Sequence, residues 1–147
     1  MREIDNYSYH LGAADCFCEM VRAGVKKLAL SHPCDSKSER DGFLPEFQKL
    51  CEKYGVKLYV EDDPLLTDLF PLSLNKGKYN VLFYQDDSVL REYLNLKEEK
   101  QQARESGSYT PECRLRIARQ YGQLLSYTEA GINRLLSANT EKEPELN

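Results

Sequence analysis

The sequence of residues 25–42 reads VKKLALSHPCDSKSERDG. Its first part, Lys26–Ser31, is a short apolar run typical of a buried strand. Pro33 ends this run, because proline has no backbone N–H with which to pair with a neighbouring strand. A polar loop follows and leads into a helical pattern. This order of strand, loop and helix is typical of an α/β protein.

The same alternation of helix and strand extends outward from this stretch. Apolar residues recur at helical spacing over Tyr9–Arg22 and Phe43–Tyr54, and a glycine follows each of these two predicted helices closely. Two further apolar runs, Lys57–Glu61 and Tyr79–Gln85, are expected to be strands. A short helix is expected between them at Asp63–Phe70, because aspartate and proline are typical of a helix start.

Strands that alternate with helices predict a parallel sheet, because parallel neighbours need crossovers that lay helices over the sheet. We therefore predict a Rossmann-like α/β fold with three parallel strands in the order 2-1-3, flanked by helices. Ligands bind such sheets beside the reversal of strand order, which here follows the first strand. The sequence leaves open whether residues 71–78 form a hairpin strand.

The carboxy-terminal part of the chain is predicted to be helical. A long helix is expected over Ser88–Arg104, followed by a helical hairpin that begins at Thr110. Its apolar residues Leu124, Leu125, Ile132 and Leu135 are expected to pack inward.

The length of 147 residues suits one domain with a sizeable core. We predict a single α/β domain over residues 1–140, of which about 88–138 form the helical carboxy-terminal extension. Residues 141–147 are expected to be a disordered, solvated tail, because they are polar and charged.

The composition argues against several classes of protein. A net charge of −4 is unlike the basic surface of a dedicated nucleic-acid binder. No signal peptide is expected in Met1–His10, and no run approaches the ~20 apolar residues of a membrane span. The cysteine count of five is odd, which favours free thiols in a reducing cytoplasm.

The loop after the first strand is the predicted site. The residues expected to bind a ligand are Ser31, His32, Cys34, Asp35, Ser36, Lys37, Arg40 and Asp86. We expect the partner to be a small polar or anionic molecule, with a protein partner or a second copy of this chain as the alternative. The sequence alone is compatible with an enzyme and with a binding module.

A first alternative is phosphate-ester chemistry at Cys34, because Cys34 and Arg40 have the Cys-x5-Arg spacing of phosphate-binding loops. In this interpretation the pKa of Cys34 is lowered, Cys34 is the first thiol to be alkylated, and Asp63 is a candidate general acid. The loop lacks the usual glycines, and Asp35 would repel a phosphate. The competing structural interpretation is a capping box, in which Ser36 caps the next helix together with the glutamate three residues on.

The first 34 residues contain five potential metal ligands, but not in a zinc-binding pattern: His10, Cys16, Cys18, His32 and Cys34. Cys16 and Cys18 lie about 200° apart around a helix and cannot share one ion. His32 and Cys34 with one carboxylate are compatible with a metal, but the spacing is unspecific. We therefore predict neither a metal site nor a cofactor.

A carboxylate site is a further alternative. Acidic residues follow each of the predicted strands, namely Glu61–Asp63, Asp86–Asp87 and Asp35. Parallel strands would bring these carboxylates to one edge of the sheet, where they could hold Mg²⁺ and a phosphate substrate. Helix capping explains aspartate at these positions equally well.

The second functional alternative is a DNA-binding helix-turn-helix in the carboxy-terminal hairpin. The recognition helix would offer Asn133 and Arg134, whereas Arg114, Arg116 and Arg119 lie on the preceding helix. Together with the acidic net charge, this distribution favours a packing hairpin, and we expect no nucleic-acid partner.

Overall fold

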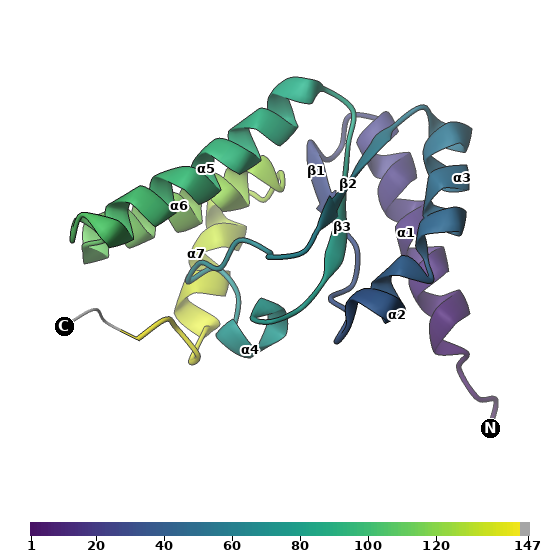
Figure 1. Ribbon diagram of the computed structural model, residues 1–147, viewed down its shortest axis with the longest axis horizontal. Coiled ribbons are helices and arrows are strands. Elements are labelled where there is room, and N and C mark those ends of the chain that lie inside the picture. The colour runs from purple at the N-terminus through teal and green to yellow at the C-terminus, as the bar shows by residue number, and fades with distance from the viewer. Residues whose placement is uncertain (145–147) are drawn as a thin grey trace. The chain divides into compact units, whose positions relative to one another are not determined.

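A computed structural model describes residues 1–144 (Figure 1). The chain divides into two compact units. The sheet unit consists of Met1–Pro64 and Gly77–Asp86, and the helical unit consists of Leu65–Lys76 and Asp87–Asn147. Among the described residues, no helix is both long enough and apolar enough to cross a membrane.

The sheet unit is a three-stranded sheet with helices packed on one face (Figure 1). Its elements are α1 (Asn6–Arg22), β1 (Leu28–Leu30), α2 (Lys37–Asp41), α3 (Leu44–Tyr54), β2 (Lys57–Glu61) and β3 (Asn80–Tyr84). Apolar side chains of α1 and α3 pack against Ala29, Val81 and Phe83 of the sheet. This core fixes the position of the loop that follows β1.

The sheet is antiparallel throughout, so the predicted parallel, Rossmann-like sheet of order 2-1-3 is wrong. The observed order is β1-β3-β2, and β3 pairs antiparallel with both of its neighbours. Every residue of β3 is buried, as expected of a central strand. β1 and β2 run in the same direction, but they lie at the two edges with β3 between them.

The segment between β2 and β3 explains this difference. Parallel neighbours need a crossover, usually a helix that covers the sheet. The only helix among residues 62–79 is α4 (Leu72–Asn75), which is too short to cover a sheet. The helix predicted at Asp63–Phe70 is not formed, and residues 71–78 do not add a hairpin strand. The chain therefore returns in the opposite direction.

The pairing of β1 with β3 continues past the end of β1 with a local irregularity. The amide of Ser31 donates to Val81, and Cys34 pairs with Tyr79. Two residues, 32 and 33, thus lie opposite the single residue Asn80, which is the arrangement of a β-bulge. Such bulges change the direction in which side chains point, and this one precedes Cys34 directly.

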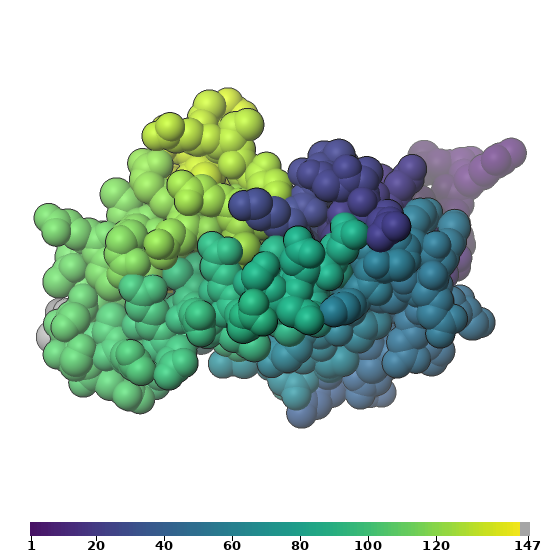
Figure 2. All heavy atoms as spheres, turned by 90° about the horizontal axis from the view of Figure 1, so that it is seen from above, coloured from purple at the N-terminus to yellow at the C-terminus, as the bar shows by residue number. Residues whose placement is uncertain are grey.

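The helical unit contains α4, α5 (Asp87–Glu105), α6 (Pro111–Leu124) and α7 (Glu129–Ala138). The atoms of α6 and α7 lie against each other in the green to yellow part of Figure 2. Gly122 allows this close approach, because a Cβ atom there would lie 2.6 Å from Cγ1 of Ile132. Leu124, Leu125 and Ile132 are buried as predicted, whereas Leu135 is only half-buried.

The end of the described chain differs from the predicted tail. Glu143 is buried and takes part in hydrogen bonds within the helical unit, so the segment from Glu141 to Pro144 is not a solvated tail. Residues 145–147, also predicted to be disordered, lie outside the described residues.

Candidate functional site

Three metal-ligating side chains meet at the loop after β1. The ligand atoms of His32, Cys34 and Glu39 all lie within 4.8 Å of one another, and we call these residues the His-Cys-Glu cluster. The Cys34 Sγ atom is 3.2 Å from Nε2 of His32. Cys34 is 1% exposed, His32 is half-buried and Glu39 is exposed, so the cluster opens to solvent on the Glu39 side.

The start of α2 positions Glu39. Ser36 is the N-cap of α2, and its hydroxyl accepts a hydrogen bond from the Glu39 amide (3.1 Å). In return, Oε2 of Glu39 accepts a hydrogen bond from the Asp35 amide (3.1 Å). Ser36 thus caps the helix as predicted, but Glu39 bonds the amide of Asp35 and not the Ser36 amide of a standard capping box. This arrangement turns the Glu39 side chain back over the loop, and a carboxylate has further lone pairs that can bind a cation.

Burial controls the chemistry of the two inner ligands. Burial raises the pKa of the Cys34 thiol to about 11, with a smaller effect from the nearby Glu39 carboxylate. Burial also lowers the pKa of His32, and the adjacent His10 ring adds to this effect. The Nδ1 atom of His32 is buried without a hydrogen-bond partner among the described residues. The other ring nitrogen, Nε2, is the one that faces Sγ of Cys34.

The other predicted site residues in the loop have structural partners. The Ser31 hydroxyl accepts a hydrogen bond from the Val81 amide (2.8 Å) and so extends the pairing with β3. Asp35 forms an ion pair with Lys78, which lowers the pKa of Asp35. Lys37 forms an ion pair with Asp62 (3.2 Å).

Arg40 is buried, and the hydrogen bonds of its guanidinium lie within the sheet unit. Nη1 donates to the carbonyl oxygens of Glu61 (2.8 Å) and Asn80 (3.2 Å), Nη2 to Asp62 (2.6 Å), and Nε to Asp41 (2.8 Å). These bonds hold α2 against the end of β2 and the beginning of β3. An arginine engaged in this way is not oriented to surround a phosphate, so the Cys-x5-Arg spacing has a structural explanation.

The antiparallel sheet separates two of the predicted site residues. Asp86 follows β3, whose end pairs with the beginning of β1 (Leu28 opposite Tyr84), so Asp86 lies at the opposite end of the sheet from Cys34. The prediction that Asp86 joins the loop is therefore wrong, and so is the predicted Mg²⁺ edge. Asp63 lies at the end of β2, where it is exposed and donates its amide to Glu61 (2.9 Å).

The cysteines should differ in reactivity in an order opposite to the one predicted from sequence. We predict that Cys16, which is exposed, and Cys113 react with iodoacetamide in the native protein well before Cys34. A pKa of about 11 lowers the thiolate fraction of Cys34 by about 100-fold relative to a free thiol, and burial adds a steric barrier. Mass spectrometry of peptides from briefly alkylated protein measures this order. Early modification of Cys34 would contradict the burial described here.

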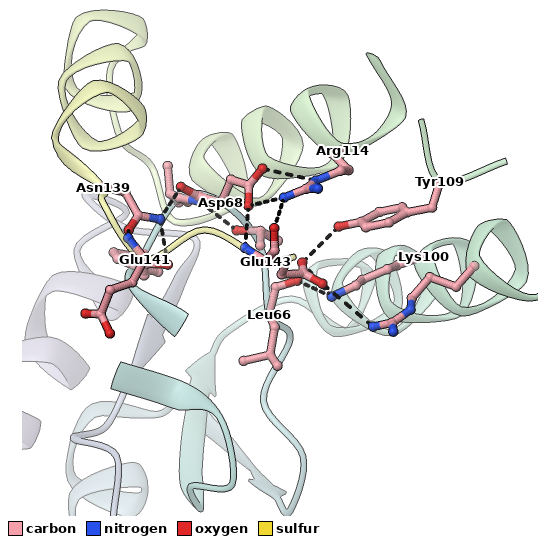
Figure 3. A network of polar contacts seen from close by, with 12 residues as sticks. Leu66, Asp68, Lys100, Tyr109, Arg114, Asn139, Glu141 and Glu143 are labelled. Atoms are coloured by element: carbon pink, nitrogen blue, oxygen red, sulfur yellow. Dashed lines mark hydrogen bonds and ion pairs between the residues drawn. The ribbon is translucent and has the colours of Figure 1, made fainter. Parts of the chain in front are cut away.

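A second cluster of polar side chains lies in the helical unit (Figure 3). Glu143 accepts hydrogen bonds from Lys100 (2.9 Å) and Tyr109 (3.0 Å), while Lys100 also donates to the carbonyl of Leu66 (2.6 Å). Burial raises the pKa of Tyr109 and lowers that of Lys100, and the Glu143 carboxylate opposes the change at Lys100.

The same network includes a bidentate pair between Arg114 and Asp68, with distances of 2.9 and 3.2 Å. Arg114 also donates to the Glu143 carbonyl (2.8 Å), and Asn139 donates to the carbonyls of Asp68 and Phe70. Each of these buried groups has a partner inside the unit, so the network is structural. Arg114 is therefore not available to DNA, as the helix-turn-helix interpretation would require.

Sequence reasoning missed Glu39 as a ligand and counted His10 among the potential metal ligands without connecting it to His32. The capping-box pattern was the signal for Glu39, since it fixes the direction of that side chain. His10 lies on α1 and is brought to His32 by the packing of the core, which no local pattern predicts.

Comparisons of the chain with protein-family models, with curated proteins and with solved structures found no match.

Proposed function

We propose that this protein binds a transition-metal ion, Zn²⁺, through His32, Cys34 and Glu39. The observation that carries the proposal is the approach of three different ligand atoms to within 4.8 Å of one another. Zinc bonds of about 2.0 Å to nitrogen and about 2.3 Å to sulfur at a tetrahedral angle place the two ligand atoms about 3.5 Å apart. The observed separation of 3.2 Å between Nε2 of His32 and Sγ of Cys34 is close to this value.

The ligand set favours zinc over the hard cations. Thiolate and imidazole prefer zinc and its neighbours among the transition metals, whereas Mg²⁺ and Ca²⁺ prefer several oxygen ligands. The cluster offers one sulfur, one nitrogen source and one carboxylate. Glu39 is exposed, so its side chain can move inward to complete the approach without disturbing the core.

A cation also agrees better with the charges of the loop than the small anion expected from the sequence. Lys37 and Arg40 are paired with Asp62, so these cations are engaged within the sheet unit. Asp35 is likewise paired with Lys78, whereas Glu39 carries negative charge beside Cys34, and this charge favours a positive ligand.

The proposed function is binding rather than catalysis by a cysteine nucleophile. A buried thiol with a raised pKa is a poor nucleophile, but metal binding displaces the thiol proton and forms the thiolate directly. We propose a location in the reducing cytoplasm, which the odd count of five cysteines supports.

Substitution of Co²⁺ for Zn²⁺ tests the proposal. One equivalent of Co²⁺ should produce a sulfur-to-cobalt charge-transfer band, and Zn²⁺ should displace it. Cys34→Ser should abolish the band. Cys34→Ser and His32→Ala should each weaken binding by more than the ~10–100-fold that loss of an outer-shell group costs.

The matched control is the double variant Cys16→Ser/Cys113→Ser, which removes the two accessible thiols outside the cluster and should keep the band. Thermal unfolding confirms that each variant is folded. Absence of stoichiometric binding to the wild-type protein, or a charge-transfer band that survives Cys34→Ser, would overturn the proposal.

A further inference from the structure

A second histidine lies directly on the His-Cys-Glu cluster. The imidazole rings of His10 and His32 are stacked with centroids 3.6 Å apart and planes 6° apart. The ring of Phe43 stands edge-on to both, at 4.8 Å from His32 and 6.5 Å from His10. His10 comes from α1, whereas the cluster comes from the loop after β1 and from α2.

We infer that His10 supplies the fourth ligand of the metal ion, an inference that rests on the proposed function. Zinc is almost always four-coordinate in structural sites, and the cluster provides three ligands. His10 has the right chemistry and is half-buried against the cluster. None of the hydrogen bonds or ion pairs among residues 1–144 involves its ring, so turning the ring breaks none of them.

The movement required is a rotation of the side chain. In the stacked arrangement the nitrogen lone pairs of the two rings lie in two nearly parallel planes and do not meet at one point. A ligated imidazole has its centroid about 3.1 Å from zinc, so two such rings at a tetrahedral angle have centroids about 5 Å apart, whereas those of His10 and His32 are 3.6 Å apart. The His10 ring must therefore move away from His32 by about 1.5 Å as it turns. The His10 ring turns about its side-chain bonds until one nitrogen faces the ion.

A fourth protein ligand changes what the site does. Three protein ligands leave a position for water or substrate, as in catalytic zinc sites, whereas four close the coordination sphere. With His10 bound, the metal joins α1, the loop after β1 and α2. Binding would thus stabilise the sheet unit as a whole.

The chain contains two histidines, so nitrogen-detected NMR of the imidazole rings reports on each ligand separately. On addition of one equivalent of Zn²⁺, the ring nitrogens of both His10 and His32 should shift and stop exchanging protons with solvent. The variant His10→Phe keeps an aromatic ring in the stack and removes the ligand. It should bind Zn²⁺ at least tenfold more weakly than the wild type, and Tyr9→Phe serves as a neighbouring control.

The outcomes separate the two proposals. A shift of His32 alone would overturn the role of His10 while leaving the three-ligand site intact. No shift of either ring would overturn the metal site itself. The NMR measurement on the wild-type protein needs no variant, so a His10→Phe protein that fails to fold leaves the test complete.

Discussion

Glu143→Ala should lower the free energy of unfolding of the helical unit by about 3–5 kcal/mol, because it leaves a buried ammonium without its carboxylate. The side chains of Lys100 and Glu143 are 9% and 7% exposed and lie 2.9 Å apart. Tyr109 would lose the acceptor of its hydroxyl as well. Chemical denaturation, with hydrogen exchange of the α6 amides to locate the change, measures this effect.

Two comparisons make the Glu143 prediction specific. Glu141→Ala removes a neighbouring carboxylate that is exposed and bonded to Ser73 (3.0 Å), and it should change stability by less than about 1 kcal/mol. Replacing both partners, Lys100→Met with Glu143→Leu, should recover most of the loss, because apolar pairs often substitute for buried ion pairs. Equal losses of stability in Glu141→Ala and Glu143→Ala would show that the buried pair of Lys100 and Glu143 stabilises the unit no more than an exposed carboxylate does.

Arg40→Ala should destabilise the sheet unit by a similar amount, about 3–5 kcal/mol. The guanidinium is 3% exposed and donates to the carbonyl oxygens of Glu61 and Asn80, which lose this donor in the variant. Asp62 would lose a charge-assisted hydrogen bond of 2.6 Å. Hydrogen exchange of the β3 amides should report the loss within the sheet.

Lys37 is the matched control for Arg40, because both side chains pair with Asp62. Lys37 is 58% exposed, and exposed ion pairs contribute about 0–1 kcal/mol. Lys37→Ala should therefore leave the denaturation midpoint nearly unchanged. A large loss of stability in Lys37→Ala together with a small loss in Arg40→Ala would show that burial does not determine the contribution of these two cations.

The positions of the strands could be predicted from sequence, but their directions could not. The apolar run Lys57–Glu61 has the same bounds as β2, and the apolar run Tyr79–Gln85 includes all of β3. Direction depends on which strand each run pairs with, and that is decided by contacts between residues far apart in the chain. The deciding feature was the absence of a covering helix in residues 62–79, where Asp63-Pro64 suggested one.

The site was predictable to the same extent. The sequence pointed to the loop from Ser31 to Arg40 and to His32 and Cys34 with one carboxylate as an unspecific combination, and it did not single out Glu39, which the structure brings to them. Local hydrogen-bond rules determine Glu39, whereas Arg40 and His10 take their roles from packing across the sheet unit. A short stretch of sequence does not predict a role that depends on packing between residues far apart in the chain.

The place of β3 has a consequence for how the protein is made. β1 and β2 are synthesised first, yet they do not pair with each other, and the sheet can form only after Asn80–Tyr84 has left the ribosome. The chain enters the helical unit at Leu65 and returns at Gly77 before that strand appears. At ~5–20 residues per second, translation from Leu65 to Tyr84 takes about 1–4 s. During that interval β1 and β2 have no strand to pair with, and their apolar faces stay uncovered.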